Sequence, residues 1–309
     1  MAEIVISEFM DEQVIAEAFA GRDVLYDPGL VDQEAALRTA VAEARALVVR
    51  NRTQVRGELL AAAGRLQVIG RLGVGLDNID LGGCAARDIK VCPAAGANDD
   101  AVAEYVITAA LLLMRGAWDA RDAVAAGDWP RMALVGHEIG AKTLGLVGYG
   151  AIARETARRA RALGMHVTAT DPYLPMDDPR RSEVHCLPFE ALIAGADILS
   201  LHVPLTHDTR HMIDADAIGQ MKPGAVLINA ARGGVVDESA LVAALKSGHL
   251  GGAALDVFET EPLTAQAGAA FKGLENLLLT PHIAGVTHES NRRVSRVTAE
   301  NVLTALDAN

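Results

Sequence analysis

Short apolar runs alternate with amphipathic segments along almost the whole chain. In the first part they cover residues 3–7, 46–50, 66–72 and 90–94, and in the second part 143–149, 166–171, 198–203, 225–230, 253–257 and 277–281. Most of the segments between them have the periodicity of helices. Short apolar runs that are bounded by turn-forming residues and separated by helices are typical of βα units. The pattern therefore predicts an α/β protein with two parallel sheets.

Two further helical segments indicate how the sheets are connected. The stretch from Asp99 to Trp129 separates the two series, and its first half is apolar almost all round, which predicts burial between domains or between subunits. An amphipathic helix over 287–308 follows the last run and is expected to return to the first sheet. We therefore predict one domain formed by residues 1–97 plus 288–309, with a second domain, 98–287, inserted into it.

The composition narrows the classes of partner. The chain has 309 residues, of which 50% are hydrophobic, so large cores can form, and its formal net charge is −12. This charge argues against a nucleic-acid or anionic-membrane partner, whereas a few local cations can still hold a small anion. The longest apolar run, 106–114, is too short to span a bilayer.

The cysteines and the N-terminal segment indicate the compartment. Cys84, Cys92 and Cys186 have no CxxC spacing, so we expect neither a disulfide framework nor a structural zinc site, and no other metal site is evident. Residues 1–13 contain no basic segment followed by an apolar one, so we expect no signal peptide. We therefore expect a cytoplasmic protein.

The stretch Thr143–Ala153 contains a glycine-rich turn between a predicted strand and a predicted helix. Gly148 permits a tight turn, and Gly150 lets backbone N–H groups approach a pyrophosphate at the helix N-terminus. Asp171 ends the next strand about 20 residues later, where a carboxylate can accept hydrogen bonds from the adenosine ribose hydroxyls and repel a 2′-phosphate. Ala153 replaces the last glycine of the fingerprint, which is an accepted variant. This context predicts an NAD site; the alternative is a glycine turn without a ligand.

Six blocks of the chain resemble one family, the D-isomer-specific 2-hydroxyacid dehydrogenases, and within it the phosphoglycerate dehydrogenase-like branch. The resemblance implies a substrate domain built from both chain ends, with a flavodoxin-like or Rossmann-like parallel sheet, and an inserted Rossmann domain that binds NAD. Because the sequence ends at Asn309, directly after the last predicted helix, we expect a short form without the C-terminal regulatory domain of many phosphoglycerate dehydrogenases. The blocks are 70–80, 145–153, 201–213, 228–241, 254–263 and 280–285.

The resemblance implies a catalytic trio of Arg232, Glu261 and His282. A histidine titrates near neutrality, so His282 can exchange the proton of the substrate oxygen. Glu261 would stabilise the imidazolium and raise the pKa of the histidine. Arg232 would bind the substrate carboxylate and polarise the keto oxygen. The alternatives are a structural histidine and an arginine that only forms surface ion pairs.

The resemblance also implies two binding sets. The arginines at 50 and 52, with Arg71 nearby, indicate a substrate with a second anionic group, such as a phosphate, a sulfonate or a carboxylate; the alternative is that they pair with surface acids. The cofactor set is Val74, Gly148, Gly150, Ala151, Ile152, Asp171, Val203, Ala230, Ala231, Arg232, Asp256, His282 and Gly285. The substrate set is Arg50, Asn51, Arg52, Gly73, Val74, Gly75, Arg232 and His282.

These observations favour an NAD-dependent oxidoreductase that interconverts a short D-configured 2-hydroxy acid and its 2-keto acid. The favoured substrates carry a second anionic group, as sulfolactate and 3-phosphoglycerate do. A hydroxypyruvate or glyoxylate reductase is an alternative enzyme, and an NAD-binding corepressor-like interaction protein is an alternative of another class. The long apolar helix and the family together imply a homodimer.

Overall fold

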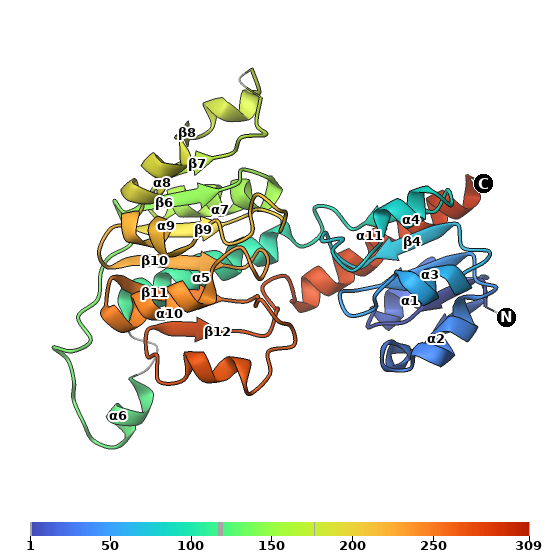
Figure 1. Cartoon of the computed structure of the whole chain (residues 1–309), viewed down its shortest axis with the longest axis horizontal. Helices are drawn as coiled ribbons and strands as arrows, with labels where there is room; N and C mark the ends of the chain where they lie inside the picture. Colours follow the sequence, from blue (N-terminus) through green and yellow to red (C-terminus); the bar gives the residue numbers. More distant parts are fainter. Residues whose placement is uncertain (1, 117–119, 176, 309) are drawn as a thin grey trace. The chain divides into compact units, whose positions relative to one another are not determined.

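The chain divides into two units in the computed structural model, which describes residues 2–116, 120–175 and 177–308. Unit 1 consists of Met1–Asn98 and Val286–Asn309, and unit 2 of Asp99–Gly285 (Figure 1). The domain limits inferred from the sequence, 97 and 288, lie within two residues of these crossings. The chain therefore crosses twice between the units.

Unit 1 is built on a parallel sheet of five strands in the order β2-β1-β3-β4-β5. This is the strand order of flavodoxin-like folds, in which helices cover both faces of the sheet. The strands are β1 (Ile4–Ile6), β2 (Val24–Tyr26), β3 (Ala46–Val49), β4 (Val68–Arg71) and β5 (Lys90–Pro93). The helices are α1 (Glu12–Ala18), α2 (Glu34–Val41), α3 (Gly57–Ala62), α4 (Leu81–Ala85) and α11 (His288–Asp307).

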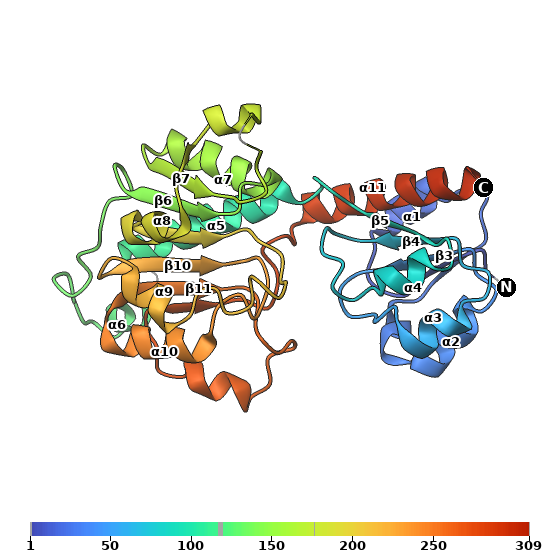
Figure 2. The same ribbon diagram turned by 45° about the horizontal axis from the view of Figure 1, so that its top comes forward.

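Alternate residues of a unit 1 strand point to opposite faces of the sheet. In β1, Ile4 and Ile6 lie in the core with α1 and α11, whereas Val5 lies in the core with α2, α3 and α4. Figure 2 shows α1 and α11 on one side of this sheet and α2 and α3 on the other. The helix α11 approaches β4 so closely that a Cβ atom on Gly70 would lie 2.5 Å from Cγ2 of Val302. The last helix is therefore an integral layer of unit 1.

Unit 2 is built on seven parallel strands in the order β12-β11-β10-β9-β6-β7-β8. The order reverses between β6 and β9, and ligands of doubly wound sheets bind at such a switch point, beyond the carboxyl ends of the strands. The strands are β6 (Thr143–Val147), β7 (His166–Thr170), β8 (His185–Cys186), β9 (Ile198–Leu201), β10 (Ala225–Asn229), β11 (Leu250–Leu255) and β12 (Leu277–Leu279). The helices are α5 (Asp99–Arg115), α6 (Arg121–Ala125), α7 (Ala151–Ala162), α8 (Phe189–Gly195), α9 (Ala215–Gln220) and α10 (Glu238–Ser247).

The unit 2 sheet separates two cores. Val226 and Ile228 of β10 pack with α5 and α7 on one face, whereas Leu227 packs with α8, α9 and α10 on the other. The prediction of two parallel-sheet α/β domains is thus confirmed. Within the described residues, no helix is both long and apolar enough to cross a membrane.

The helix predicted from Asp99 to Trp129 is wrong in its extent. The helix α5 ends at Arg115, and Gly116 adopts a φ of 58°, a left-handed conformation that favours glycine and ends a helix. The N–H of His137 donates to the carbonyl of Met114 at 2.7 Å, so a returning segment satisfies the last turn. Residues 117–119 lie outside the described residues. The predicted burial of the first half is confirmed, because its buried residues include Ala101, Val102, Ala103, Val106, Ile107, Ala109 and Ala110.

Two strands are absent from the sequence-based series. Both β2 and β8 lie at an edge of their sheet and have only 3 and 2 residues. Whereas all three residues of β1 are buried, no residue of β2 or β8 is, so neither strand lies in the buried core that the series of apolar runs reflects. The helix predicted over 287–308 is confirmed as α11, which begins after Thr287, whose Oγ1 accepts the N–H of Ser290 at 3.0 Å in a capping box.

Candidate active site

The glycine-rich turn of unit 2 has the geometry that a pyrophosphate requires. Gly148 adopts a φ of 90°, and a Cβ atom there would lie 2.5 Å from the carbonyl oxygen of His202. Gly150 is the N-cap of α7 and gives it no side-chain hydrogen bond, and no heavy atom lies within 4 Å of the place a Cβ atom would take. The space beside Gly150 is therefore open at the N-terminus of α7, and a helix N-terminus is where an anionic group of NAD fits.

Asp171 follows β7 at the same edge of the sheet. Its Oδ2 accepts the N–H of Tyr149 at 2.9 Å, and its Oδ1 accepts the N–H of Tyr173 at 2.9 Å. Each carboxylate oxygen has a second lone pair, so both remain able to accept from ribose hydroxyls. Ala153, in the first turn of α7, is fully buried against the sheet, which is the close helix–strand contact expected at this position.

A half-buried histidine, His202, lines the turn. Nε2 of His202 lies 3.0 Å from Oγ of Ser200. Burial lowers the pKa of His202 to about 4, so the ring is uncharged at neutral pH. The next residue, Val203, is half-buried and packs against the core formed with α8, α9 and α10.

The side chains of His282 and Glu261, which the sequence predicts to act together, are in contact. Nδ1 of His282 lies 2.7 Å from Oε2 of Glu261, and the two side chains are 35% and 30% exposed. Oε1 of Glu261 accepts the N–H of Phe258 at 3.0 Å, which fixes the other half of the carboxylate. Because Nδ1 is engaged by Glu261, Nε2 is the nitrogen that remains to exchange a proton with a ligand.

Opposing effects set the ionisation of Glu261. Burial alone would raise the pKa of Glu261, but the hydrogen bond and charge of His282, the N–H of Phe258 and the charge of Arg232 together lower it. The carboxyl group is therefore ionised when His282 carries a proton. The charge of Arg232 is the smallest of these causes, so its guanidinium lies near enough to Glu261 to favour the ionised carboxylate.

Arg232 is held in a loop directly after β10. The buried side chain of Asn229 donates from Nδ2 to the carbonyl of Arg232 at 2.9 Å and accepts the N–H of Ala231 at 3.1 Å. A Cβ atom on Gly233 would lie 1.7 Å from the carbonyl oxygen of Phe258, so this loop packs directly against the segment that leads to Glu261. The Arg232 guanidinium donates to the carbonyl of Ala231 at 2.5 Å.

Asp256 has a role that the sequence-based reasoning missed. The resemblance includes it in the cofactor set, and the structure shows in addition that its carboxylate, 1% exposed, accepts hydrogen bonds from three groups of one loop. These donors are the hydroxyl of Thr280 at 2.6 Å and the N–H groups of Ile283 and Ala284, each at 2.8 Å. The carbonyl of Asp256 also accepts the N–H of His282 at 2.8 Å. Asp256 therefore shapes the loop that carries the histidine.

A buried carboxylate also organises the predicted substrate loop of unit 1. Oε1 of Glu8 accepts the N–H groups of Arg50 and Thr53 at 2.8 and 2.9 Å, and Oε2 accepts that of Arg52 at 3.1 Å. Nδ2 of Asn78 donates to the carbonyls of Arg50 and Thr53. An acid at the end of the first apolar run was the available signal for Glu8, because such runs end at the ligand-binding edge of a parallel sheet.

The two arginines of this loop have different surroundings. The Arg52 guanidinium pairs with Asp32, and its side chain is 54% exposed, which matches the alternative of a surface ion pair. The Arg50 guanidinium donates to Oδ1 of Asn291 at 2.7 Å and lies over the ring of Phe9, 5.8 Å from its centroid. Burial lowers the pKa of Arg50, although the charge of Glu8 opposes this. In the part of the chain that the structure describes, no carboxylate oxygen comes within ion-pair distance of the Arg50 guanidinium.

The predicted glycine loop follows β4. Gly73 adopts a φ of 138°, and a Cβ atom there would lie 1.8 Å from Nη1 of Arg71, so the arginine side chain covers this glycine. Nη1 of Arg71 donates to the carbonyl of Leu72 at 2.9 Å. Val74 is 41% exposed, Gly75 follows it, and Asn51 is also exposed.

The predicted residues form one set in each unit. Those of unit 1, at 50–52 and 73–75, follow β3 and β4, at the carboxyl ends of neighbouring strands. Among the described residues, no group of three or more His, Cys, Asp or Glu side chains is placed to hold a metal ion. The set of unit 2 lies at or beyond the carboxyl ends of its strands and comprises Gly148, Gly150, Ala151, Ile152, Asp171, Val203, Ala230, Ala231, Arg232, Asp256, Glu261, His282 and Gly285.

Comparison with known proteins gives this geometry a context. The family described as "D-isomer specific 2-hydroxyacid dehydrogenase, NAD binding domain" matches residues 107–284. The (S)-sulfolactate dehydrogenase of Chromohalobacter salexigens is 54% identical over 99% of this chain and 99% of its own. The D-3-phosphoglycerate dehydrogenase of Mycobacterium leprae is 41% identical over 87% of this chain, which spans about half (51%) of that protein. The D-lactate dehydrogenase of Aquifex aeolicus, solved with NAD and lactic acid, has a TM-score of 0.85 at 28% identity, covering 99% of this chain and 96% of its own.

Proposed function

Because the chain belongs to the D-isomer-specific 2-hydroxyacid dehydrogenases, an NAD-dependent family, we propose that it acts on a short 2-hydroxy acid with a second anionic group. Its product is the corresponding 2-keto acid. The observation that carries the proposed mechanism is the 2.7 Å contact between Nδ1 of His282 and Oε2 of Glu261. This contact leaves one imidazole nitrogen for the substrate and places a negative charge behind the ring.

The proposed chemistry is a coupled loss of a proton and a hydride from the hydroxy acid. Bound NAD, which the turn at Gly148 and Gly150 and the carboxylate of Asp171 would hold, would supply the acceptor for the hydride that leaves C2. His282 takes the hydroxyl proton on Nε2, and the ionised Glu261 stabilises the imidazolium that forms. In the reverse direction the same imidazolium returns the proton to the keto oxygen.

Arg232 is proposed to orient the substrate at this pair. Its guanidinium has a planar set of donors that can bind a carboxylate in a bidentate manner and polarise the C2 oxygen. The tight packing of its loop on the segment before Glu261 supports a fixed distance between the two side chains. An Arg232→Ala enzyme with the kcat and KM of the wild type would contradict this role.

We assign Arg50 as the residue that binds the second anionic group of the substrate. A partly buried guanidinium whose described partner is the neutral Asn291 has a charge that a ligand can neutralise. Arg52, which pairs with Asp32, is a weaker candidate. The relative that acts on (S)-sulfolactate supports a sulfonate as this group.

The (S) configuration in the name of that relative's substrate agrees with membership of a D-specific family. In lactate the carboxyl group outranks the methyl group in the naming rules. In sulfolactate the carbon that bears sulfur outranks the carboxyl group, so the label changes while the arrangement in space does not. (S)-Sulfolactate therefore has the configuration of a D-2-hydroxy acid.

A substrate screen tests the proposal. Purified protein should reduce NAD faster with sulfolactate or 3-phosphoglycerate than with lactate or glycerate, measured as kcat/KM from NADH absorbance. We expect a preference of roughly tenfold or more, because a hydrogen bond to a charged group contributes about 1.5–3 kcal/mol. Arg50→Gln should reduce this preference, and Arg52→Gln should change it less. If lactate or glycerate exceeds both dianionic acids, the assignment of a second anionic group is wrong.

We also propose a homodimer whose interface includes exposed apolar side chains of the segment that joins α5 to β6. The exposed fractions of Trp129, Met132 and Val135 are 75%, 85% and 72%, which is unusual for large apolar side chains in one short segment. Light scattering should give the mass of two chains. The double variant Trp129→Asp, Met132→Asp should shift the mass toward that of one chain, and a wild type that is monomeric at micromolar concentration would refute the dimer.

A cytoplasmic location is proposed from the chemistry of the chain. The free thiols of Cys84, Cys92 and Cys186 suit a reducing compartment. Detection of the protein in a secreted fraction of its source cells would contradict this location.

A further inference from the structure

A chain of two hydroxyl groups leads from the long helix α5 to the loop that carries His282. The hydroxyl oxygen of Tyr105 lies 2.6 Å from Oγ1 of Thr280, and Oγ1 lies 2.6 Å from Oδ1 of Asp256. An ionised carboxylate only accepts, so Thr280 donates its single hydroxyl proton to Asp256. The threonine oxygen then accepts from Tyr105. The direction of the chain is thus fixed: Tyr105 donates to Thr280, and Thr280 donates to Asp256.

The carboxylate at the end of this chain holds the histidine loop in an uncommon conformation. His282 adopts a φ of 56°, in the left-handed region that few non-glycine residues occupy. The residues on its C-terminal side, Ile283 and Ala284, are held through their N–H groups by the Asp256 carboxylate, and Thr280 is held on the N-terminal side. Asp256 therefore anchors the loop on both sides of His282. Such a conformation persists where surrounding contacts determine it.

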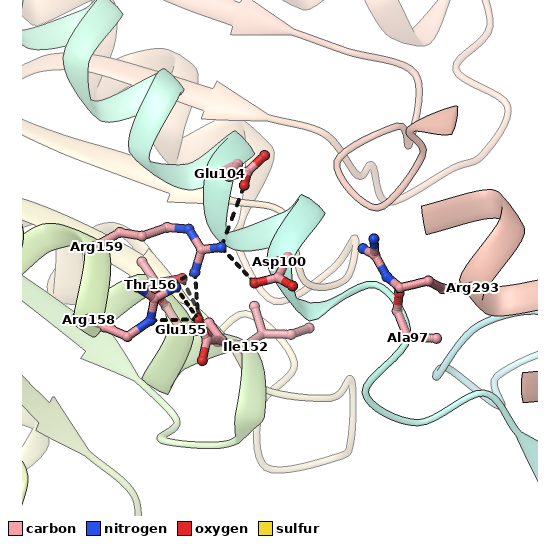
Figure 3. A network of polar contacts seen from close by, with 9 residues as sticks. All are labelled: Ala97, Asp100, Glu104, Ile152, Glu155, Thr156, Arg158, Arg159 and Arg293. Atoms are coloured by element: carbon pink, nitrogen blue, oxygen red, sulfur yellow. Dashed lines mark hydrogen bonds and ion pairs between the residues drawn. The ribbon is translucent and has the colours of Figure 1, made fainter. Parts of the chain in front are cut away.

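The helix that presents Tyr105 is itself fixed. Figure 3 shows Arg159 of α7 directed at the carboxylates of Asp100 and Glu104, which precede Tyr105 on α5. The Arg159 guanidinium lies 2.6 Å from Oδ1 of Asp100 and 3.5 Å from Oε1 of Glu104. The ring of Tyr105 packs against the core between α5, α7 and the sheet. A phenylalanine would fill that core equally well, so the hydroxyl is the atom whose presence requires another reason.

We propose that Tyr105 is a positioning residue, whose hydroxyl orients Thr280 on Asp256 and thereby holds His282 in its left-handed conformation toward Glu261. The inference rests on the proposed proton exchange by His282. It assigns Tyr105 no contact with substrate or cofactor.

The protonation state of Asp256 makes this series of hydrogen bonds dependent on pH. Burial raises the pKa of Asp256, whereas the hydroxyl of Thr280, the N–H groups of Ala284 and Ile283 and the charge of His282 oppose this. Burial also raises the pKa of Tyr105, so the phenol keeps the proton that it donates. Protonation of Asp256 would remove acceptors that the loop requires. Loss of the Tyr105 hydroxyl weakens the Thr280 donor and should move this protonation to higher pH.

The test compares Tyr105→Phe with Tyr26→Phe, which also loses one hydroxyl bond, from Tyr26 to the carbonyl of Met10 at 3.2 Å in unit 1. With NAD and racemic sulfolactate, Tyr105→Phe should lower kcat roughly three- to tenfold, which corresponds to the net contribution of one hydrogen bond. The acid limb of its pH profile should move to higher pH, and its Kd for NADH should be unchanged. Hydrogen exchange of a peptide covering 280–284 should be faster. Tyr26→Phe should retain wild-type values.

Variants at Thr280 show whether the effect of Tyr105→Phe passes through the hydroxyl of Thr280 or comes from packing of the ring. Thr280→Ser keeps the hydroxyl and should retain most activity, whereas Thr280→Val removes it. Adding Tyr105→Phe to Thr280→Val should cause no further loss if Tyr105 acts through Thr280. An equal loss from Tyr105→Phe in both backgrounds would overturn the proposal, as would a Tyr105→Phe enzyme with wild-type pH profile and exchange. If His282→Ala abolishes turnover and Tyr105→Phe has no effect, only this inference fails; if His282→Ala remains active, the proposed mechanism fails.

Discussion

Replacement of His282 by alanine is expected to lower kcat by roughly 10²- to 10⁴-fold, the usual contribution of a positioned general acid–base group. The reason is the loss of the nitrogen that exchanges the hydroxyl proton. Glu261, 2.7 Å from Nδ1, cannot take over, because its carboxylate lies behind the ring. NADH titration should show a Kd close to that of the wild type, because the pyrophosphate turn and Asp171 are untouched.

The matched control is His166→Ala. His166 is an exposed histidine at the first position of β7, at the amino end of the strand and thus away from the carboxyl edge of the sheet. It should retain wild-type turnover. Near-normal turnover of the His282→Ala protein would remove the histidine from the mechanism.

Replacement of Asp171 by alanine should change the choice of cofactor. Loss of the carboxylate removes acceptors for the ribose hydroxyls and the repulsion of a 2′-phosphate, so we expect the ratio of affinities for NAD over NADP to fall roughly 10- to 100-fold. Fluorescence titration with NADH and NADPH measures this ratio directly. A variant that keeps the wild-type ratio of affinities would show that this carboxylate does not discriminate between the adenosine riboses of NAD and NADP.

A second substitution separates this effect from damage to the turn. The same carboxylate accepts the N–H groups of Tyr149 and Tyr173, so alanine also leaves two backbone donors without acceptors. Asp171→Asn removes the charge and keeps one oxygen. If repulsion of the phosphate dominates, the asparagine variant should gain NADPH affinity as alanine does, with a smaller loss of thermal stability.

The sequence predicts those parts of the fold that depend on residues close together in the chain. Apolar runs and helical periodicity are properties of neighbouring residues, so they locate most of the strands of both sheets. The glycine turn and Asp171 are likewise linked by the short βαβ unit that contains them. For Arg232, Glu261 and His282 the spacing alone carried no such information, and the family resemblance supplied their roles.

The parts that the sequence does not predict depend on contacts between distant residues. Asp256 and Thr280 are 24 positions apart, and the bond between them follows from the register of β11 and β12. Glu8 reaches a loop more than 40 residues later. The end of α5 at Arg115 depends on a segment that returns to cap it. Such pairings are fixed only when the strands have found their neighbours.

The insertion of unit 2 has a consequence for biosynthesis. The ribosome makes all five strands of unit 1 first, then the whole of unit 2, and only afterwards the helix α11 that packs on β4 at Gly70. A nascent chain can therefore complete unit 2 while the part of the first sheet that α11 covers is still exposed, with only α1 packed on that face. That face is exposed to aggregation for the time needed to translate Asp99–Gly285. Faster translation of the inserted unit would shorten this exposure, and a chaperone that binds apolar strands would protect it.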